Sequence, residues 1–153
     1  MTGFLTALAL LGNGLTAGIM LSTVMGIVPL TAVQTYDRYV ETIQFLWPRY
    51  DPFMPITHVL TVVLDLVLVF LAPEPEARAL FGVAGVVLVV VMAISVIKNV
   101  PINRYVMSLD PATVPDAWET KDPRRSWRNW NLLRTSLALG GLVVNAAGAA
   151  VLM

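Results

Sequence analysis

Four long runs of apolar residues dominate the 153-residue sequence, and they restrict what it can fold into. They cover residues 4–30, 54–72, 79–97 and 132–153, and Asp65 is the only acidic or basic residue well inside any of them. A helix needs roughly 20 apolar residues to cross the hydrocarbon core of a bilayer. Charged residues make up 13% of the chain, about half the share found in soluble domains. We therefore predict an all-α integral membrane four-helix bundle that forms a single domain over residues 1–153.

The distribution of lysine and arginine predicts the orientation of this bundle. Nearly all of them lie in loop 1, between the first two runs, and in loop 3, between the last two, whereas Arg78 alone lies in the turn "PEPEAR". Short loops rich in these residues stay in the cytoplasm. Loops 1 and 3 are thus predicted to be cytoplasmic, with both termini outside. The expected location is the inner or plasma membrane of a bacterium.

The connections predict how the helices are joined. "PEPEAR" is short enough to make the second and third helices antiparallel neighbours. In loop 1, helical spacing relates Tyr36, Tyr39, Val40, Ile43 and either Leu46 or Trp47, which predicts an amphipathic helix along the membrane interface. Loop 3 is long, and its prolines at 111, 115 and 123 argue against a continuous helix. The last helix is predicted to begin at 122–123.

Composition excludes several classes of function. The absence of cysteine rules out disulfide and thiolate chemistry, and a single histidine argues against a metal site built by this chain alone. The net charge is zero, and no basic strip suited to nucleic acid is present. We find no internal repeat. Gly14 and Gly18 form a GxxxG pattern, which predicts helix packing.

Polar residues at the start of the fourth run share one helical face. Trp127, Asn131 and Arg134 fall at i, i+4 and i+7, and Trp130 precedes Arg134 by four residues. One interpretation is that the tryptophans mark the membrane interface and that Arg134 extends back to the headgroups. The other is a pocket that faces the bundle. The shared face of an amide, a guanidinium and an aromatic ring favours the pocket.

The third run ends in "IKNVPINRYV" and leaves two interpretations open. If the helix continues, Asn99 and Asn103 share a face, and Pro101 leaves the carbonyl of Ile97 without a donor. If Pro101 ends the helix, the asparagines cap the helix end and the loop. Spacing alone does not separate a helix terminator from a pair of amides presented to a ligand.

The second run carries His58, Thr61 and Asp65 on one face. Asp65 lies near the middle of the bilayer, where a charged carboxylate is costly. We expect it to be protonated or hydrogen-bonded to Asn13 or Asn145, and to support the structure together with Thr61. His58 lies about one turn inside the cytoplasmic end and is a candidate base.

The predicted topology brings these residues to one level of the membrane. The second helix begins, the third ends and the fourth begins at the cytoplasmic side. Three helices therefore contribute an imidazole, amides, an indole and a guanidinium to one end of the bundle, from His58, Asn99, Asn103, Trp127, Asn131 and Arg134. We expect a pocket there, open to the cytoplasm or to the inner leaflet.

The second half of the chain resembles a known family. "NVPINR", a hydrophilic loop with prolines, and "WRNWNLLRT" leading into the last helix are similar to the anthrone oxygenase family (DUF1772) of small four-helix membrane proteins. The resemblance covers most of the chain, while its specific motifs lie within residues 99–135. The positions that match the family pattern are Asn99, Pro101, Asn103, Trp118, Trp127, Asn131 and Arg134.

The resemblance implies an oxygenase that converts anthrones to anthraquinones in aromatic polyketide biosynthesis, a branch of secondary metabolism. It implies no flavin or metal, so no cofactor is expected and O₂ is the co-substrate. The expected catalytic residues are His58 as base, with Asn99, Asn103 and Arg134 as donors to the enolate oxygen. Substrate-binding roles fall to four further residues, namely Trp118, Trp127, Trp130 and Asn131.

Two other functions remain open at this point. The same pocket suits a noncatalytic binding or accessory subunit that holds a quinone, a lipid or a partner protein. A small transporter is the weakest alternative, because only Asp65 marks a path through the bilayer. The expected partners are an apolar aromatic small molecule and membrane lipid but no nucleic acid, and homo-oligomerisation is left open.

Overall fold

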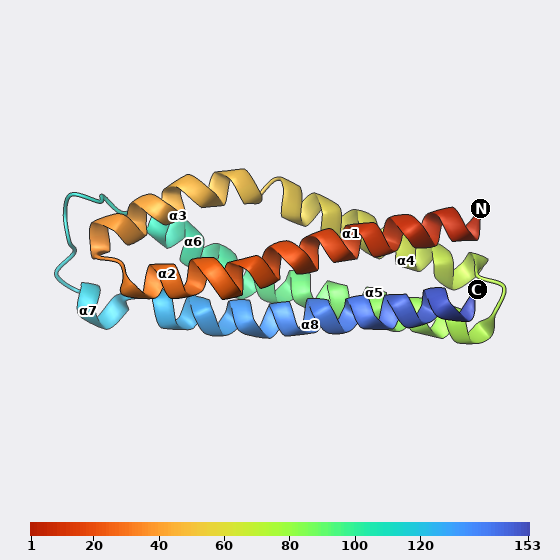
Figure 1. Cartoon of the computed structure of the whole chain (residues 1–153). Coiled ribbons are helices and arrows are strands. Elements are labelled where there is room, and N and C mark those ends of the chain that lie inside the picture. Colours follow the sequence, from red (N-terminus) through yellow and green to blue (C-terminus); the bar gives the residue numbers. More distant parts are fainter.

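The computed structural model describes residues 1–153 and consists of four long helical columns that run side by side (Figure 1). The columns are α1 (Thr2–Ser22), η1 (Thr23–Ile27) and α2 (Val28–Val33); α3 (Tyr36–Tyr50) and α4 (Phe53–Leu71); α5 (Pro75–Ile94), η2 (Ser95–Asn99) and α6 (Val100–Met107); and α7 (Trp118–Lys121) and α8 (Arg124–Val151). The segments η1 and η2 are π-helical. The predicted all-α four-helix architecture is confirmed.

The four columns close into a ring. α1 and α5 each pack against both α4 and α8. Both termini and the turn between α4 and α5 lie at one end, while α2, α3, α6 and α7 lie at the other (Figure 1). We call the latter the loop end. The α4–α5 turn is closed by a hydrogen bond of 2.6 Å from Arg78 Nε to the Ala72 carbonyl, and it makes α4 and α5 antiparallel neighbours, as predicted.

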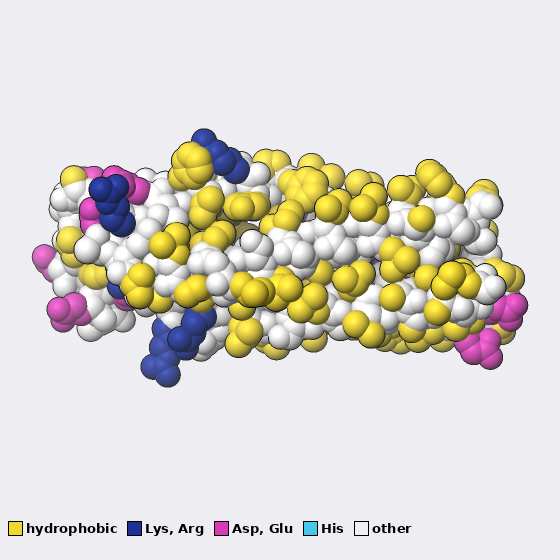
Figure 2. Space-filling view, viewed as in Figure 1, with side chains coloured by type: hydrophobic (Ala, Val, Ile, Leu, Met, Phe, Trp, Pro, Cys, Tyr) yellow, Lys and Arg dark blue, Asp and Glu magenta, His cyan; other side chains and the backbone are white.

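Each column is long and apolar enough to cross a membrane. The columns contain 32 to 36 residues, and a helix of that length extends about 50 Å, against roughly 30 Å of hydrocarbon. Charged side chains gather at the two ends of the molecule, and a belt without them lies between (Figure 2). The chain is thus an integral membrane protein whose columns project beyond the hydrocarbon. Which end faces the cytoplasm stays a prediction.

The third column does not end at Pro101. The helix continues from η2 into α6, which contains Pro101. Of the two interpretations of this stretch, the one in which the helix continues past the proline is therefore correct. In η2 the Val100 N–H bonds to the Ser95 carbonyl, five residues back. The wider turn leaves room for the proline ring, which in a regular helix would clash with the carbonyl four residues earlier.

The first column contains a second π segment of the same kind. Val28 N–H bonds to the Thr23 carbonyl in η1, and Pro29 follows directly. The two π segments share the pattern Thr/Ser-Val-x-x-x-Val-Pro, written "TVMGIVP" at 23–29 and "SVIKNVP" at 95–101. A π turn therefore precedes and accommodates both Pro29 and Pro101.

The predicted helix of loop 1 is present as α3. Four of the residues expected on its apolar face are buried, namely Tyr36, Tyr39, Val40 and Ile43, whereas Leu46 and Trp47 are half-buried. It runs lengthwise along the bundle and leads into α4, rather than lying across the end of the molecule (Figure 1). Its buried face joins Val106, Trp118 and Trp127 in a hydrophobic core at the loop end. The helix thus packs on protein, because α6, α7 and α8 also extend to this level.

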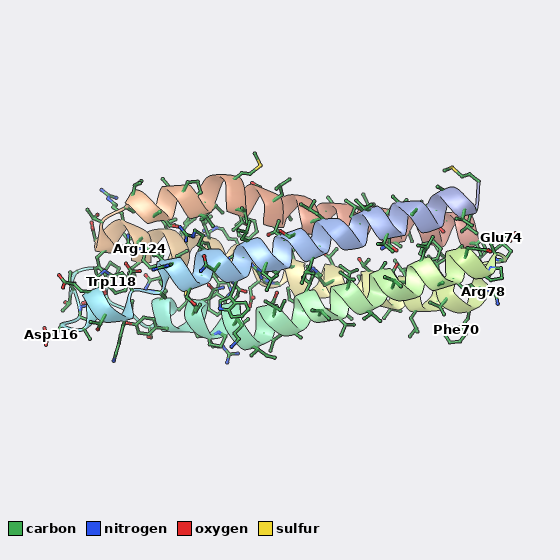
Figure 3. The ribbon with its side chains drawn as sticks, turned by 90° about the horizontal axis from the view of Figure 1, so that it is seen from below. Phe70, Glu74, Arg78, Asp116, Trp118 and Arg124 are labelled. Carbon is green, nitrogen blue, oxygen red and sulfur yellow. The ribbon has the colours of Figure 1, made fainter.

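Loop 3 has no long helix before residue 122, as predicted. Trp118–Lys121 forms the short helix α7, which the sequence patterns did not indicate. The Asp122 carboxylate accepts the Arg124 N–H at 2.9 Å, where α8 begins. Trp118 and Arg124 lie at the loop end, far from Phe70, Glu74 and Arg78 at the other end (Figure 3).

Close helix packing involves glycines other than those predicted. A Cβ added to Gly14 or Gly18 would meet nothing within 4 Å, so the GxxxG pattern makes no contact inside the chain. Gly12 instead faces the Thr61 hydroxyl of α4, and Gly148 faces the Phe81 ring of α5 at 3.2 Å from the added Cβ. These two positions let α1 and α8 approach their neighbours closely.

Candidate functional site

Two adjoining cavities lie in the loop-end half of the bundle. The first, of about 70 Å³, lies between η1 and the second column, and nine of its twelve lining residues are hydrophobic. The second, of about 140 Å³, lies between the second and third columns and is lined by His58, Ser95 and Asn99. Five residues line both, namely Trp47, Tyr50, Met54, Asn103 and Arg134. We call the first the apolar cavity and the second the polar cavity.

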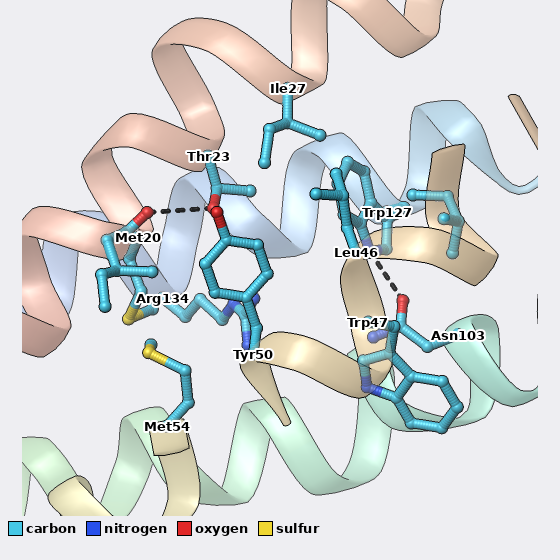
Figure 4. A pocket seen from close by; sticks show the side chains of 12 residues that line it. Met20, Thr23, Ile27, Leu46, Trp47, Tyr50, Met54, Asn103, Trp127 and Arg134 are labelled. Atoms are coloured by element: carbon cyan, nitrogen blue, oxygen red, sulfur yellow. Dashed lines mark hydrogen bonds between the residues drawn. The ribbon is translucent and has the colours of Figure 1, made fainter. Parts of the chain in front are cut away.

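Arg134 reaches from α8 to the place where the two cavities meet (Figure 4). Its Nη1 donates to Ser95 Oγ at 3.0 Å, and its Nη2 and Nε donate to Asn131 Oδ1 at 2.6 Å and 3.1 Å. The two salt bridges of the chain, Arg38–Glu41 and Arg124–Asp122, lie elsewhere. Arg134 therefore brings positive charge into an apolar region without a carboxylate to balance it, which favours an anionic partner.

A chain of hydrogen bonds holds the surrounding residues in place. Asn131 Nδ2 donates to the backbone carbonyl of Trp127 at 2.8 Å. Trp127 Nε1 donates to Asn103 Oδ1 at 2.9 Å, the contact that is dashed between these two residues in Figure 4. α8 and α6 are thereby linked at the cavity wall. Asn131 lines neither cavity and orients the guanidinium of Arg134, whereas the Trp127 ring lines the apolar cavity.

His58 lines the polar cavity and has a nitrogen without a hydrogen-bond partner. Its Nδ1 lies 2.9 Å from the Met54 carbonyl, which only accepts hydrogen bonds, so Nδ1 carries the hydrogen and Nε2 is the basic nitrogen. Nε2 is buried and has no hydrogen-bond partner. The side chain of Asn99 is 1% exposed, and neither of its polar atoms has a partner. Since buried polar atoms are normally paired, these groups are available to a ligand.

Besides Asn131, four residues named from the sequence lie outside the two cavities. Trp118 packs edge-on against Tyr36 in the loop-end core, with ring centroids 4.7 Å apart. Trp130 is half-buried, and Lys98 Nζ lies 5.1 Å from its ring centroid. Thr61 and Asp65 lie deeper in the bundle, away from the cavity linings. The structure thus brings together His58, Asn99, Asn103, Trp127 and Arg134 at the cavities, and Asn131 directly behind Arg134.

The deeper polar cluster is separate from the cavities. Asn145 Nδ2 donates to Asp65 Oδ2 at 3.3 Å, so one of the two expected partners of Asp65 is in place. The other, Asn13, is fully buried, and neither of its amide atoms has a partner. Thr61 donates to the Thr57 carbonyl of its own helix at 2.8 Å. Of these groups, the Asn145–Asp65 pair joins α4 and α8 in the middle of the bundle.

Several site residues were missed from the sequence. Ser95 accepts the Arg134 hydrogen bond and in turn donates to the Val91 carbonyl at 2.8 Å. Thr23, its counterpart in the first π segment, lines the apolar cavity opposite Trp47 and Tyr50. The available signals were the repeated pattern itself and the four-residue spacing between Ser95 and Asn99.

No group of three or more histidine, cysteine, aspartate or glutamate side chains in the chain is placed to hold a metal ion. The expectation that the chain needs no cofactor stays a prediction.

The fold and the cavities define a small helical membrane protein with an unbalanced cation, a free imidazole nitrogen and unpaired amide groups around a partly apolar space. The sequence model of the anthrone oxygenase family matches residues 45–144. The match includes every polar residue of the polar cavity, while Thr23 and the rest of the first column lie outside it. The chain belongs to this family, as the motifs at 99–135 predicted, and its membership indicates an oxygenase-like role. No curated protein and no solved structure matches the chain.

Proposed function

We propose that this protein is a cofactor-independent oxygenase of the membrane that oxidises an apolar, anthrone-like aromatic substrate with O₂. The observation that carries this proposal is that a free basic nitrogen and an unbalanced positive charge lie on the wall of one cavity. His58 offers a basic nitrogen, and Arg134 offers positive charge without a counter-ion. A carbon acid that becomes an enolate needs both.

The first step is the removal of a proton from carbon. The ring CH₂ group of an anthrone loses a proton to give an enolate whose negative charge rests mainly on oxygen. His58 Nε2 takes this proton while Nδ1–H stays bonded to the Met54 carbonyl. General-base transfer of this kind contributes roughly 10²–10⁴-fold to a rate.

The second requirement is a set of donors for the enolate oxygen. The Arg134 guanidinium and the Asn99 amide N–H groups line the polar cavity with His58. Removing one preorganised donor of this kind costs about 3 kcal/mol in the transition state. Asn131 and Ser95 hold the guanidinium in position, so it need not reorganise during the reaction.

The last step uses O₂. The enolate carbon gives up electrons to O₂ and forms a carbon–oxygen bond, and the proton on His58 completes a hydroperoxide. Cleavage of its O–O bond, with loss of the second hydrogen on the same carbon, releases water and leaves a ketone. In sum, anthrone and O₂ give anthraquinone and water, and His58 returns to its basic form.

Oxygen uptake by the purified protein in detergent, with anthrone as substrate, tests the proposal. We expect His58→Gln and Arg134→Gln each to lower kcat/KM by roughly 100-fold or more. Arg128→Gln is the matched control, because Arg128 is exposed on the same helix and lines neither cavity. A native protein that binds anthrone but takes up no O₂ would support the noncatalytic binding subunit instead.

A further inference from the structure

The apolar cavity joins the outer surface of the bundle to the proposed reaction site. One of its walls comes from the first column, with Met20, Thr23 and Ile27, and the other from α3, with Leu46 and Tyr50 (Figure 4). Its inner end is Arg134, which also lines the polar cavity. The two cavities thus form a path that is apolar at one end and polar at the other.

The surface around the mouth of this path is apolar. Met25 lies between Thr23 and Ile27 in the sequence, and Phe53 directly precedes Met54; their side chains are 72% and 43% exposed. On a face of α3 that lines neither cavity, the guanidinium of Arg49 lies 3.6 Å from the centroid of the Phe45 ring, which is typical of a cation at the edge of the hydrocarbon. The only hydroxyl on the first-column wall, that of Thr23, donates to its own helix at the Ile19 carbonyl. The mouth therefore suits lipid more than water.

The outer wall of the path adjoins a break in the second column. α3 ends at Tyr50 and α4 begins at Phe53, and prolines stand at 48, 52 and 55. Trp47 Nε1 donates to the Asp51 carboxylate at 3.1 Å across this break. Because prolines remove helix hydrogen bonds, the wall is held there by side-chain contacts more than by a regular helix.

We propose that the apolar cavity is the lateral entrance and ring-binding subsite for the substrate, which reaches Arg134 from the hydrocarbon of the membrane. This rests on the proposed function. The matching substrate is uncharged, flat and apolar, with one oxygen at its leading edge to meet Arg134. The cavity of about 70 Å³ is smaller than the roughly 300 Å³ of typical ligand pockets. The side chains of Trp47 and Tyr50 therefore move outward when the ring system enters.

The natural absence of cysteine allows a direct test with single-cysteine variants. Leu46→Cys places a thiol on the cavity wall, and Phe45→Cys places one on the preceding residue, which is exposed and lines neither cavity. Each variant is reacted with pyrene maleimide in the folded detergent-solubilised protein. We expect the label at position 46 to lower kcat/KM for anthrone by about tenfold or more, and the label at position 45 to leave it within about twofold.

Protection against labelling gives a second readout that needs no turnover. Excess anthraquinone should slow the reaction of the maleimide with the Leu46→Cys variant and leave its reaction with the Phe45→Cys variant unchanged. Thr23→Cys repeats the experiment from the opposite wall, so the result does not depend on one variant. Protection in a protein that takes up no O₂ would keep the subsite and overturn the oxygenase. Full turnover after labelling at both wall positions, without protection, would overturn the entrance and keep the oxygenase.

Discussion

Replacing Asn131 with aspartate tests the charge on Arg134 with almost no change of shape. Asn131 Oδ1 accepts hydrogen bonds from Arg134 Nη2 at 2.6 Å and from Nε at 3.1 Å. In Asn131→Asp the oxygen at this place carries negative charge, and the guanidinium gains the carboxylate partner that it lacks in the native chain. A substrate enolate then meets an arginine whose charge is already balanced.

The substitution should affect stability and activity in opposite ways. The substitution removes the hydrogen bond of 2.8 Å from Asn131 Nδ2 to the Trp127 carbonyl, which costs about 1 kcal/mol. The new ion pair offsets this, since breaking a buried pair costs at most about 3–5 kcal/mol. We expect the free energy of unfolding to stay the same or to rise. Loss of the oxyanion donor should lower kcat roughly 10²–10³-fold.

Thermal unfolding followed by circular dichroism, together with O₂ uptake in the same detergent, measures both effects. Asn131→Ala is the comparison variant, because it removes both contacts of the amide and adds no charge, so stability and activity should fall together. A protein with Asn131→Asp that unfolds like the native chain and keeps its native kcat/KM would refute the reasoning. Arg134 would then act through its shape or through packing, and not through its charge.

Two further predictions concern packing in the bundle. Gly12→Ala puts a methyl group against the Thr61 hydroxyl, which is hydrogen-bonded to the Thr57 carbonyl, and should lower the free energy of unfolding by about 1–3 kcal/mol. Adding Thr61→Ala should relieve this loss. Gly14→Ala, which has open space around it, serves as the neutral control. Asn145→Leu removes the hydrogen bond to Asp65 and should lower the free energy of unfolding by about 1–3 kcal/mol. The control Leu142→Ile on the same helix should lower it by less than half as much. Equal losses of stability in thermal unfolding would show that the Asp65 contact contributes nothing.

Most of the architecture follows from hydropathy, because a segment that crosses hydrocarbon must pair its own backbone hydrogen-bonding groups, and an α-helix does so within one segment. The residues around the two cavities follow from topology, since the helix ends that carry His58, Asn99 and Arg134 must meet at one level. Which side chain of a helical face turns inward was harder to predict. Trp127 and Trp130 are equally plausible from spacing, and the choice between them depends on how α8 packs against α6. Ser95 was missed because a hydroxyl in a membrane helix is normally satisfied by its own backbone.

The π segments explain how one helix presents so many polar groups to one cavity. Ser95, Asn99 and Asn103 all line the polar cavity at successive steps of four residues. In a regular α-helix each such step turns the side chain by about 40°, so Asn103 would point about 80° away from Ser95. The π turn over Ser95–Asn99 contains more residues and cancels much of this drift. The local widening thus both accommodates Pro101 and brings the three side chains to one side of the helix. A pattern of residues four apart indicates a shared face, but it does not reveal that a π turn is what aligns them.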